Sequence, residues 1–191
     1  PRINGIDFGW DHPTAYAWLA WDRDLDVVYL YDEYRRTEQP VEMHAIAMKK
    51  HGVWMPTAWP QDGLNDTPAG PQLSQQYRAA GLRMRPVHAQ LPETMDRSGE
   101  VKSRTSVEAG VAMMLGRMLS GKFKVFRTCQ LFLGERRQYH RQEGKIVKVK
   151  DDLISATRYA MADLRYAEVR GDMERTPRAV AFRPLDPAMN Y

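Results

Sequence analysis

Three runs of strand-forming residues open the chain and constrain its fold more than any later feature. Ile3–Phe8 is apolar and carries a glycine, while Ala15–Trp21 and Val27–Tyr31 are rich in aromatic and β-branched residues. The polar residues 22–24 (DRD) separate the last two runs and indicate a hairpin connection. Three consecutive strands with tight connections predict an antiparallel meander at the start of a sheet.

The rest of the chain alternates between helical and strand-like patterns. Apolar spacing predicts helices over 40–51, 71–80, 106–119 and 153–169, short strands over 57–60, 82–87 and 124–126, and a hairpin within 135–150. This element order is that of an RNase H-like α/β fold. We therefore expect a central mixed β-sheet, antiparallel in strands one to three and then parallel. Helices should flank this sheet, and a basic β-hairpin should precede the last helix.

Composition bounds the class of protein. The 191 residues suffice for one well-buried core, and we expect a single domain over residues 1–170. Residues 171–191 contain three prolines and no periodicity, which predicts an extended or disordered tail. No apolar run approaches the roughly 20 residues that span a bilayer, so we expect no membrane partner. The chain lacks an initiator Met and enters a strand almost at once, which we interpret as a fragment of a longer protein.

Four aspartates lie at the ends of predicted elements. Asp7 lies in the apolar run GIDFG, Asp62 follows a strand in WPQDG, and Asp151 and Asp152 open the last helix. In an RNase H-like element order, the first strand, the end of the fourth strand and a late helix meet at one edge of the sheet. We therefore expect these carboxylates to converge there on a divalent metal ion.

Each of these acids also has a plainer interpretation. Asp62 before glycine is a common turn pair, and an acidic pair at a helix start is a common cap. Asp7 is costly in an apolar strand unless it is paired or metal-bound, although an edge strand would tolerate it. Glu33, at the end of the third strand, either supports the cluster or pairs with Arg35 or Arg36. The joint placement of the aspartates favours the metal site.

The type of ligand indicates the type of metal and the chemistry. Oxygen ligands without histidine or cysteine favour Mg²⁺ or Mn²⁺, here one or two ions. Such ions activate a water, polarise a phosphodiester and stabilise the leaving oxygen of an in-line displacement. The sequence therefore predicts phosphodiester hydrolysis, with Asp7, Asp62, Asp151 and Asp152 as catalytic and metal-binding residues.

Basic residues adjoin the acidic helix. The net charge of +4 and the pI of about 9.2 suit a nucleic acid partner without requiring one. A two-stranded ribbon can enter a groove of duplex DNA, although charge runs are usually only solvated surface. We interpret the hairpin as tracking the DNA backbone. The candidate DNA-binding residues are Arg136, Arg137, Arg141, Lys145, Lys148, Lys102 and Arg104.

Five segments together resemble a known family. They are GIDFGWDHPTA (5–15), WPQDG (59–63), VKSRTSVEAGVAMMLGRM (101–118), GERRQY (134–139) and KVKDDLISATRYA (148–160). They are similar to the C-terminal nuclease domain of the large terminase subunit, the DNA-packaging motor of tailed bacteriophages. The similarity covers residues 3–167 and is greatest to terminases of headful-packaging phages.

The resemblance implies an RNase H-like endonuclease that cuts concatemeric double-stranded viral DNA when packaging starts and ends. Asp7 and Asp62 match the family's first and second metal ligands. Asp151 and Asp152 match its last acidic pair, with Asp152 the preferred ligand. Many relatives carry another Asp where this chain has Ser155, which leaves the number of ions open. The implied partners are an ATPase domain, the small terminase subunit and the portal ring, in the host cytoplasm during infection.

Two other functions compete with this one. An actin-like or sugar-kinase ATPase also begins with an Asp-x-Gly phosphate turn, similar to Asp7-Phe8-Gly9. Such enzymes need two lobes and a second phosphate loop, for which the chain has neither length nor motif. The Walker A pattern GxxxxGK[ST] is absent too, so we expect no ATP-driven translocation. The non-enzymatic alternative is a DNA-binding or portal-docking module whose acids are structural.

Overall fold

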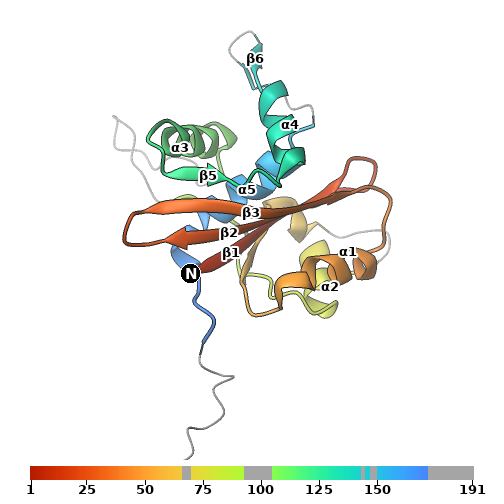
Figure 1. Ribbon diagram of the computed structural model, residues 1–191. Coiled ribbons are helices and arrows are strands. Elements are labelled where there is room, and N and C mark those ends of the chain that lie inside the picture. Colours follow the sequence, from red (N-terminus) through yellow and green to blue (C-terminus); the bar gives the residue numbers. More distant parts are fainter. Residues whose placement is uncertain (66–69, 93–104, 143–144, 147–149, 172–191) are drawn as a thin grey trace, which may run out of the picture.

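A five-stranded mixed sheet forms the centre of the molecule (Figure 1). The computed structural model describes residues 1–65, 70–92, 105–142, 145–146 and 150–171. The strand order is β4-β1-β2-β3-β5, with β1 (Arg2–Asp7), β2 (Thr14–Asp22), β3 (Val27–Arg36), β4 (Thr57–Ala58) and β5 (Phe123–Val125). The first three strands pair antiparallel, as predicted, and β4 and β5 join the two edges in parallel.

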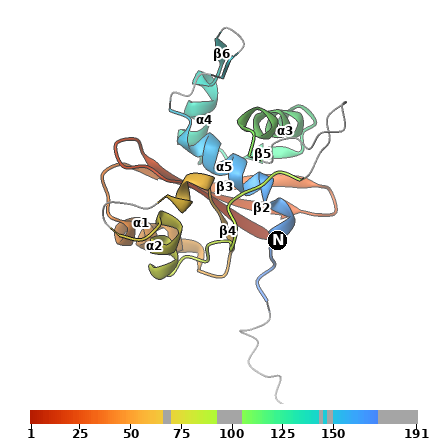
Figure 2. The same ribbon diagram turned by 180° about the vertical axis from the view of Figure 1, so that it is seen from behind.

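Helices cover both faces of the sheet (Figures 1 and 2). One face carries α3 (Val107–Leu119), α4 (Gln130–Gln138) and α5 (Asp152–Ala162), and the other carries α1 (Val41–Met48) and α2 (Leu73–Ala79). Three 3-10 turns and a two-stranded hairpin complete the described elements: η1 (Lys49–His51), η2 (Gln61–Leu64), η3 (Leu164–Tyr166), β6 (Arg141–Gln142) and β7 (Lys145–Ile146). Among the described residues, no helix is both long and apolar enough to cross a membrane.

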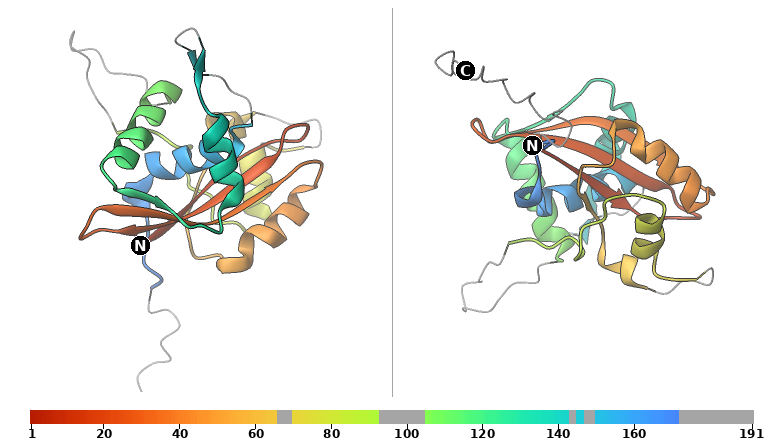
Figure 3. Two further views of the ribbon diagram at one scale, coloured as in Figure 1. Left: turned by 45° about the horizontal axis from the view of Figure 1, so that its top comes forward. Right: turned by 90° about the horizontal axis from the view of Figure 1, so that it is seen from below.

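The alternation of side chains along β2 divides the core into two layers. Ala15, Ala17 and Leu19 face α3, α4 and α5, whereas Tyr16 and Trp18 face α1 and α2. All five are buried, and each large side chain contributes about 2–3 kcal/mol by leaving water. The small side chains on one face give α5 room to lie close to the sheet, between α3 and α4 (Figure 3, left). The aromatic rings fill the wider space under α1 and α2.

The packing of α5 on β1 is closest at Gly5. A Cβ at this position would overlap the carbonyl oxygen of Ala156 and stand 3.1 Å from the Cβ of Ala160. Only glycine therefore fits where the helix crosses the strand. The crossing brings the start of α5, with Asp152, towards the end of β1, with Asp7.

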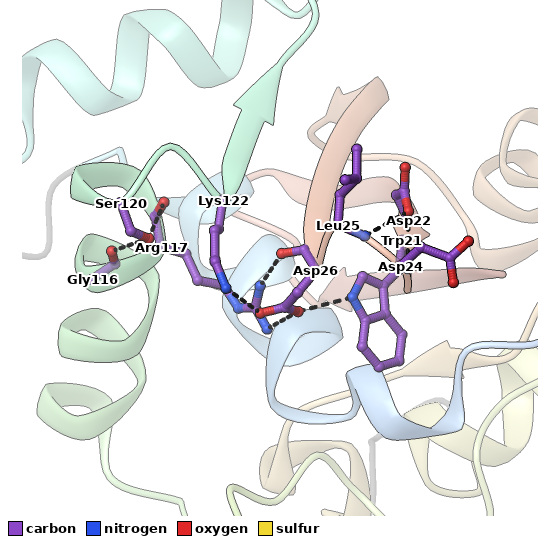
Figure 4. Close-up of polar contacts among 9 residues, drawn as sticks. All are labelled: Trp21, Asp22, Asp24, Leu25, Asp26, Gly116, Arg117, Ser120 and Lys122. Atoms are coloured by element: carbon purple, nitrogen blue, oxygen red, sulfur yellow. Dashed lines mark hydrogen bonds and ion pairs between the residues drawn. The ribbon is translucent and has the colours of Figure 1, made fainter.

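Asp26 fastens the β2–β3 turn to α3 (Figure 4). Its carboxylate accepts hydrogen bonds from Arg117 Nη2 (3.0 Å), Lys122 Nζ (3.3 Å) and Trp21 Nε1 (3.1 Å), and its backbone oxygen accepts one from Arg117 Nη1 (3.1 Å). Asp26 adopts a left-handed φ of 51°, which aspartate tolerates better than most residues. These contacts fix the end of the sheet remote from Asp7.

Several predicted elements differ in the structure. Residues 130–138 form α4, where we expected the hairpin to begin at 135, because Glu33 of β3 holds the N–H groups of the first helical turn. Residues 82–87 form only an isolated bridge, Met84 to Thr57, because the chain makes too few backbone bonds to β4 for a strand. The last helix ends at Ala162 instead of residue 169, since Glu168 pairs with Arg2 of β1. The predicted tail lies, apart from Gly171, outside the described residues.

Candidate metal centre

Asp7 is the last residue of β1 and lies at the edge of the sheet where this strand ends. Burial raises the pKa of its carboxyl group well above the usual range, and the carboxylates of Asp62 and Asp152 raise it further. The Arg158 guanidinium opposes this shift. Asp151 adds a smaller effect that also raises this pKa. Asp7 of β1 therefore interacts electrostatically with residues of η2 and of the start of α5.

Asp62 reaches this rim from the strand beside β1. β4 pairs in parallel with β1, so both strands end at the same edge, and two residues separate the end of β4 from the start of η2. A Cβ at Gly63 would come within 2.6 Å of Phe8 and 2.7 Å of Trp59, so the turn is packed against the second core layer. Asp62 is exposed as a residue, yet partial desolvation of its carboxyl group raises its pKa. Backbone N–H groups and His12 lower that pKa in part.

Asp152 and Asp151 come from the start of α5. Asp152 is buried, with 10% of its side chain exposed, and its Oδ1 lies 3.4 Å from His12 Nδ1. Burial raises the pKa of Asp152, His12 and Arg35 lower it, and Asp151 raises it. Asp151 occupies the N-cap position, but its side chain makes no capping bond to a residue that the structure describes. Asp151 thus occupies the position that the cap interpretation expected, but without the side-chain bond of a cap.

Two residues near these acids were not singled out from the sequence. His12 lies in the β1–β2 connection and faces Asp152, while it also interacts electrostatically with Asp62. Glu135 of α4 accepts hydrogen bonds from the backbone N–H groups of Leu153 and Ile154. Burial raises the pKa of Glu135 to about 7, although Ile154 N–H and Arg35 lower it. Glu135 lies within GERRQY, but no local pattern indicates its partner in α5.

Glu33 neither joins the acid cluster nor pairs only with a neighbouring arginine. Its two carboxylate oxygens accept hydrogen bonds from the N–H groups of Leu131 (2.8 Å) and Phe132 (2.9 Å) at the start of α4. Both expectations for this residue are incomplete, because its partner lies 98 positions away in the sequence. Arg35 interacts electrostatically with Glu33 but makes its ion pair with Glu135.

The aspartates suit a hard divalent ion in their chemistry, although they are not assembled around one point. Among the described residues, no three Asp, Glu, His or Cys side chains stand at ligand spacing. Burial is the main cause of the raised pKa values at Asp7, Asp62 and Asp152, and neighbouring carboxylates add to it at Asp7 and Asp152. An oxygen donor set of this kind fits Mg²⁺ or Mn²⁺. A bound cation would offset the repulsion between carboxylates that lie close together.

A cleft of about 210 Å³ opens beside Asp62 and extends between η2, α3 and α5. Arg158 and Tyr159 line it, and the guanidinium of Arg158 lies 4.4 Å from the ring centre of Tyr159. A Cβ at Gly110 would stand 2.7 Å from Cδ of Arg158, so the glycine lets the arginine stem pass under α3. The positive charge of Arg158 in this cleft lowers the pKa of Asp7 in part.

The predicted DNA-binding residues divide into three groups. Arg136 and Arg137 are exposed in the last turn of α4, not on the hairpin as expected, because this segment is helical. Arg141 of β6 and Lys145 of β7 belong to the small hairpin, which projects away from the sheet beyond α4 (Figure 1). The remaining candidates, Lys148, Lys102 and Arg104, lie outside the described residues.

The mixed sheet with helices on both faces is that of an RNase H-like fold. The family model described as "Terminase RNaseH-like domain" matches residues 4–164, and the chain belongs to this family. The large terminase subunit of Salmonella phage P22 is 39% identical over 187 residues, which are 97% of this chain and 36% of the relative. The chain thus spans just over a third of the length of that relative.

Solved structures agree with the family assignment. The P22 large terminase nuclease domain superposes with a TM-score of 0.76 at 42% identity, covering 87% of this chain and 82% of that one. The nuclease domain of the bacteriophage SPP1 large terminase, solved with bound Mn, gives a TM-score of 0.60 at 16% identity, covering 85% and 86%. At that identity the SPP1 likeness shows the fold alone. The chain is therefore a terminase nuclease domain with an RNase H-like fold.

Proposed function

We propose that the chain is a divalent-metal-dependent endodeoxyribonuclease that cuts double-stranded viral DNA during genome packaging. The observation that carries this proposal is the electrostatic coupling of Asp7 to Asp62 and Asp152 at one edge of the sheet. Carboxylates brought together from distant segments repel one another unless a cation joins them.

The residues of the chain have separate roles in this proposal. Asp7, Asp62 and Asp152 hold the ions, one or two Mg²⁺ or Mn²⁺, and Asp151 is a further candidate ligand. When bound, such ions activate a water and stabilise charge on the phosphodiester and its leaving oxygen. The rigid β1–α5 crossing at Gly5 and the packed η2 turn set the backbone positions of the three acids. The exposed arginines of α4, Arg136 and Arg137, contribute positive charge for DNA phosphates.

The partners follow from the relatives. Because the P22 relative is almost three times longer than the matched segment, we infer that an ATPase domain accompanies this domain in a complete large subunit. Concatemeric DNA as the substrate, the small terminase subunit, the portal ring and a location in the host cytoplasm during infection are further parts of the proposal. The extent of the nuclease domain, residues 1–170, is also part of it.

A plasmid-nicking assay with Mn²⁺ tests the proposal directly. The wild-type chain should convert supercoiled plasmid to nicked and linear forms, and Asp7→Asn should abolish cutting while leaving the fold intact by circular dichroism. Asp24→Asn is the matched control, since Asp24 is an exposed aspartate in the β2–β3 turn, and it should cut as wild type does. If the wild-type chain cuts with neither Mn²⁺ nor Mg²⁺ at any concentration, the non-catalytic docking module becomes the better account.

A further inference from the structure

Glu135 links α4 to the first turn of α5, the turn that carries Asp152. Its Oε2 accepts hydrogen bonds from the backbone N–H groups of Leu153 (2.8 Å) and Ile154 (3.0 Å). The first N–H groups of a helix have no partner within the helix and need an external acceptor. The N-cap residue Asp151 gives no such bond from its side chain within the described part of the chain. A side chain from another helix therefore supplies the cap.

We propose that Glu135 is a positioning residue for Asp152, a role that rests on the nuclease function proposed above. Leu153 follows Asp152 directly, so a bond that fixes the Leu153 N–H also fixes the peptide plane next to the Asp152 Cα. Metal-binding side chains work only when their supporting groups hold them close to the productive geometry. Glu135 sets the backbone from which the Asp152 carboxylate reaches the ion.

The second oxygen of Glu135 is held from the sheet. Arg35 of β3 donates from Nη1 to Oε1 at 2.5 Å, and the Glu135 side chain is only 2% exposed. Both carboxylate oxygens are thus engaged by protein donors in a buried site. This arrangement locks the side-chain conformation of Glu135.

Glu33 caps the start of α4 in the same way that Glu135 caps the start of α5. Its carboxylate receives the N–H groups of Leu131 and Phe132, the first residues of α4 after Gln130. β3 therefore fixes α4 through Glu33, and α4 fixes α5 through Glu135. The two caps form one connected support from the centre of the sheet to Asp152.

A β-bulge in β3 directs the Glu33 side chain towards α4. β3 pairs Leu30 with Leu19 and Asp32 with Trp18, which leaves Tyr31 as an extra residue. Leu30 and Glu33 both face α4 and α5, although regular alternation would place residues three apart on opposite faces. Bulges commonly redirect side chains next to active sites. The bulge therefore turns the side chains of Glu33 and Arg35 towards α4 and α5.

Three variants of the full chain test the role of Glu135. Glu135→Ala removes the acceptor, and Glu135→Gln keeps a side-chain oxygen for the two N–H groups but loses the charge. Asp163→Asn is the matched control, because Asp163 is a buried carboxylate at the other end of α5 with its own arginine partner, Arg85. The readouts are the Mn²⁺ concentration for half-maximal cutting, calorimetric Mn²⁺ binding, and amide hydrogen exchange at Leu153 and Ile154.

Glu135→Ala should raise the half-saturating Mn²⁺ concentration by about 10- to 100-fold, as outer-shell substitutions do, and should speed exchange at both amides. Glu135→Gln should recover most of the metal affinity. Asp163→Asn should lower the melting temperature without changing either Mn²⁺ readout. Mn²⁺ affinity of Glu135→Ala within about twofold of wild type, or a loss equal to that of Asp163→Asn, would overturn the positioning role. Absence of Mn²⁺ binding and cutting in the wild type would instead overturn the nuclease function itself.

Discussion

The carbonyl oxygen of Ala156 in α5 fills the space that a side chain on Gly5 of β1 would need. We predict that Gly5→Ala separates the helix from the strand and costs about 3 kcal/mol of unfolding free energy or more, because the opposing atom is backbone and cannot rotate away. The separation also moves Asp152 away from Asp7, so Mn²⁺ affinity and cutting should fall in the molecules that remain folded. Urea unfolding and calorimetric Mn²⁺ titration measure the two effects.

Gly116→Ala is the control for this substitution. Gly116 lies inside α3, and a Cβ there meets no heavy atom of the described chain within 4 Å. Alanine is favoured over glycine in a helix interior, so the change should stabilise the protein by about 1 kcal/mol and leave Mn²⁺ binding alone. Equal stability of the two alanine variants would show that the β1–α5 crossing is not as close as described.

Mn²⁺ and pH should have linked effects on the unfolding free energy of the chain. The pKa values of Asp7, Asp62 and Asp152 are raised, mainly by burial, and that of Glu135 is raised to about 7. A carboxyl group with a raised pKa binds its proton more tightly in the folded state. Its contribution to stability is therefore complete below the unfolded-state pKa, about 4, and is lost as pH rises through the folded-state pKa. The metal-free chain should therefore lose stability as the pH rises from about 4 through about 7, the folded-state pKa of Glu135.

Mn²⁺ should reverse this loss, because it binds the ionised carboxylates and only the folded state assembles them. The increase in melting temperature on adding Mn²⁺ to the EDTA-treated chain should thus grow with pH. Asp26 and Asp32 have pKa values shifted the other way: slight desolvation raises them, but hydrogen bonds from basic partners outweigh it. They stay ionised in this range. In Asp7→Asn the Mn²⁺ effect should be small at every pH; a full-sized effect there would exclude Asp7 as a ligand.

The two aspartates at the start of α5 should contribute unequally to Mn²⁺ binding. Asp152 is buried and lies 3.4 Å from His12, whereas Asp151 is half-buried at the N-cap; both carboxylates raise the pKa of Asp7, that of Asp152 more strongly. Asp152→Asn should remove measurable Mn²⁺ binding, and Asp151→Asn should weaken it by about 10-fold or less, in the range of outer-shell changes. Calorimetry on both variants gives the answer. A larger loss in Asp151→Asn would exchange the roles of the two residues.

Charge reversal on α4 and the β6–β7 hairpin should weaken DNA binding. Replacing Arg137, Arg141 and Lys145 by Glu removes three positive charges that we assign to phosphate contacts. The slope of log K against log salt should fall by about 0.9 for each lost contact, and the Mn²⁺ affinity should not change. Fluorescence anisotropy with a labelled duplex between low and moderate salt measures the slope. Lys122→Glu is the control, because Lys122 lies near Asp26, at the end of the sheet remote from Asp7. It should change neither the salt slope nor the Mn²⁺ affinity if DNA binds at α4 and the hairpin.

Local sequence patterns were sufficient for much of this architecture. The meander, the helices α1, α2 and α3, and the positions of Asp7, Asp62 and Asp152 at element ends all follow from periodicity and turn chemistry, which act over a few residues. The expected coincidence of β1, β4 and α5 at one edge followed from element order alone. The metal role of the aspartates stays a prediction.

Only the tertiary structure decided how these acids are supported. The helix α4 exists where a strand was expected because Glu33 caps it from 98 positions away, and α5 begins at Asp152 because Glu135 caps it from a separate helix. The β-bulge at Tyr31 and the approach of His12 to Asp152 likewise join segments that are distant in the chain. Such contacts leave no periodic signal, because each depends on the folded path of two segments and not on the residues beside it. The sequence by itself determined which acids stand at the sheet rim, and long-range packing determined what holds them there.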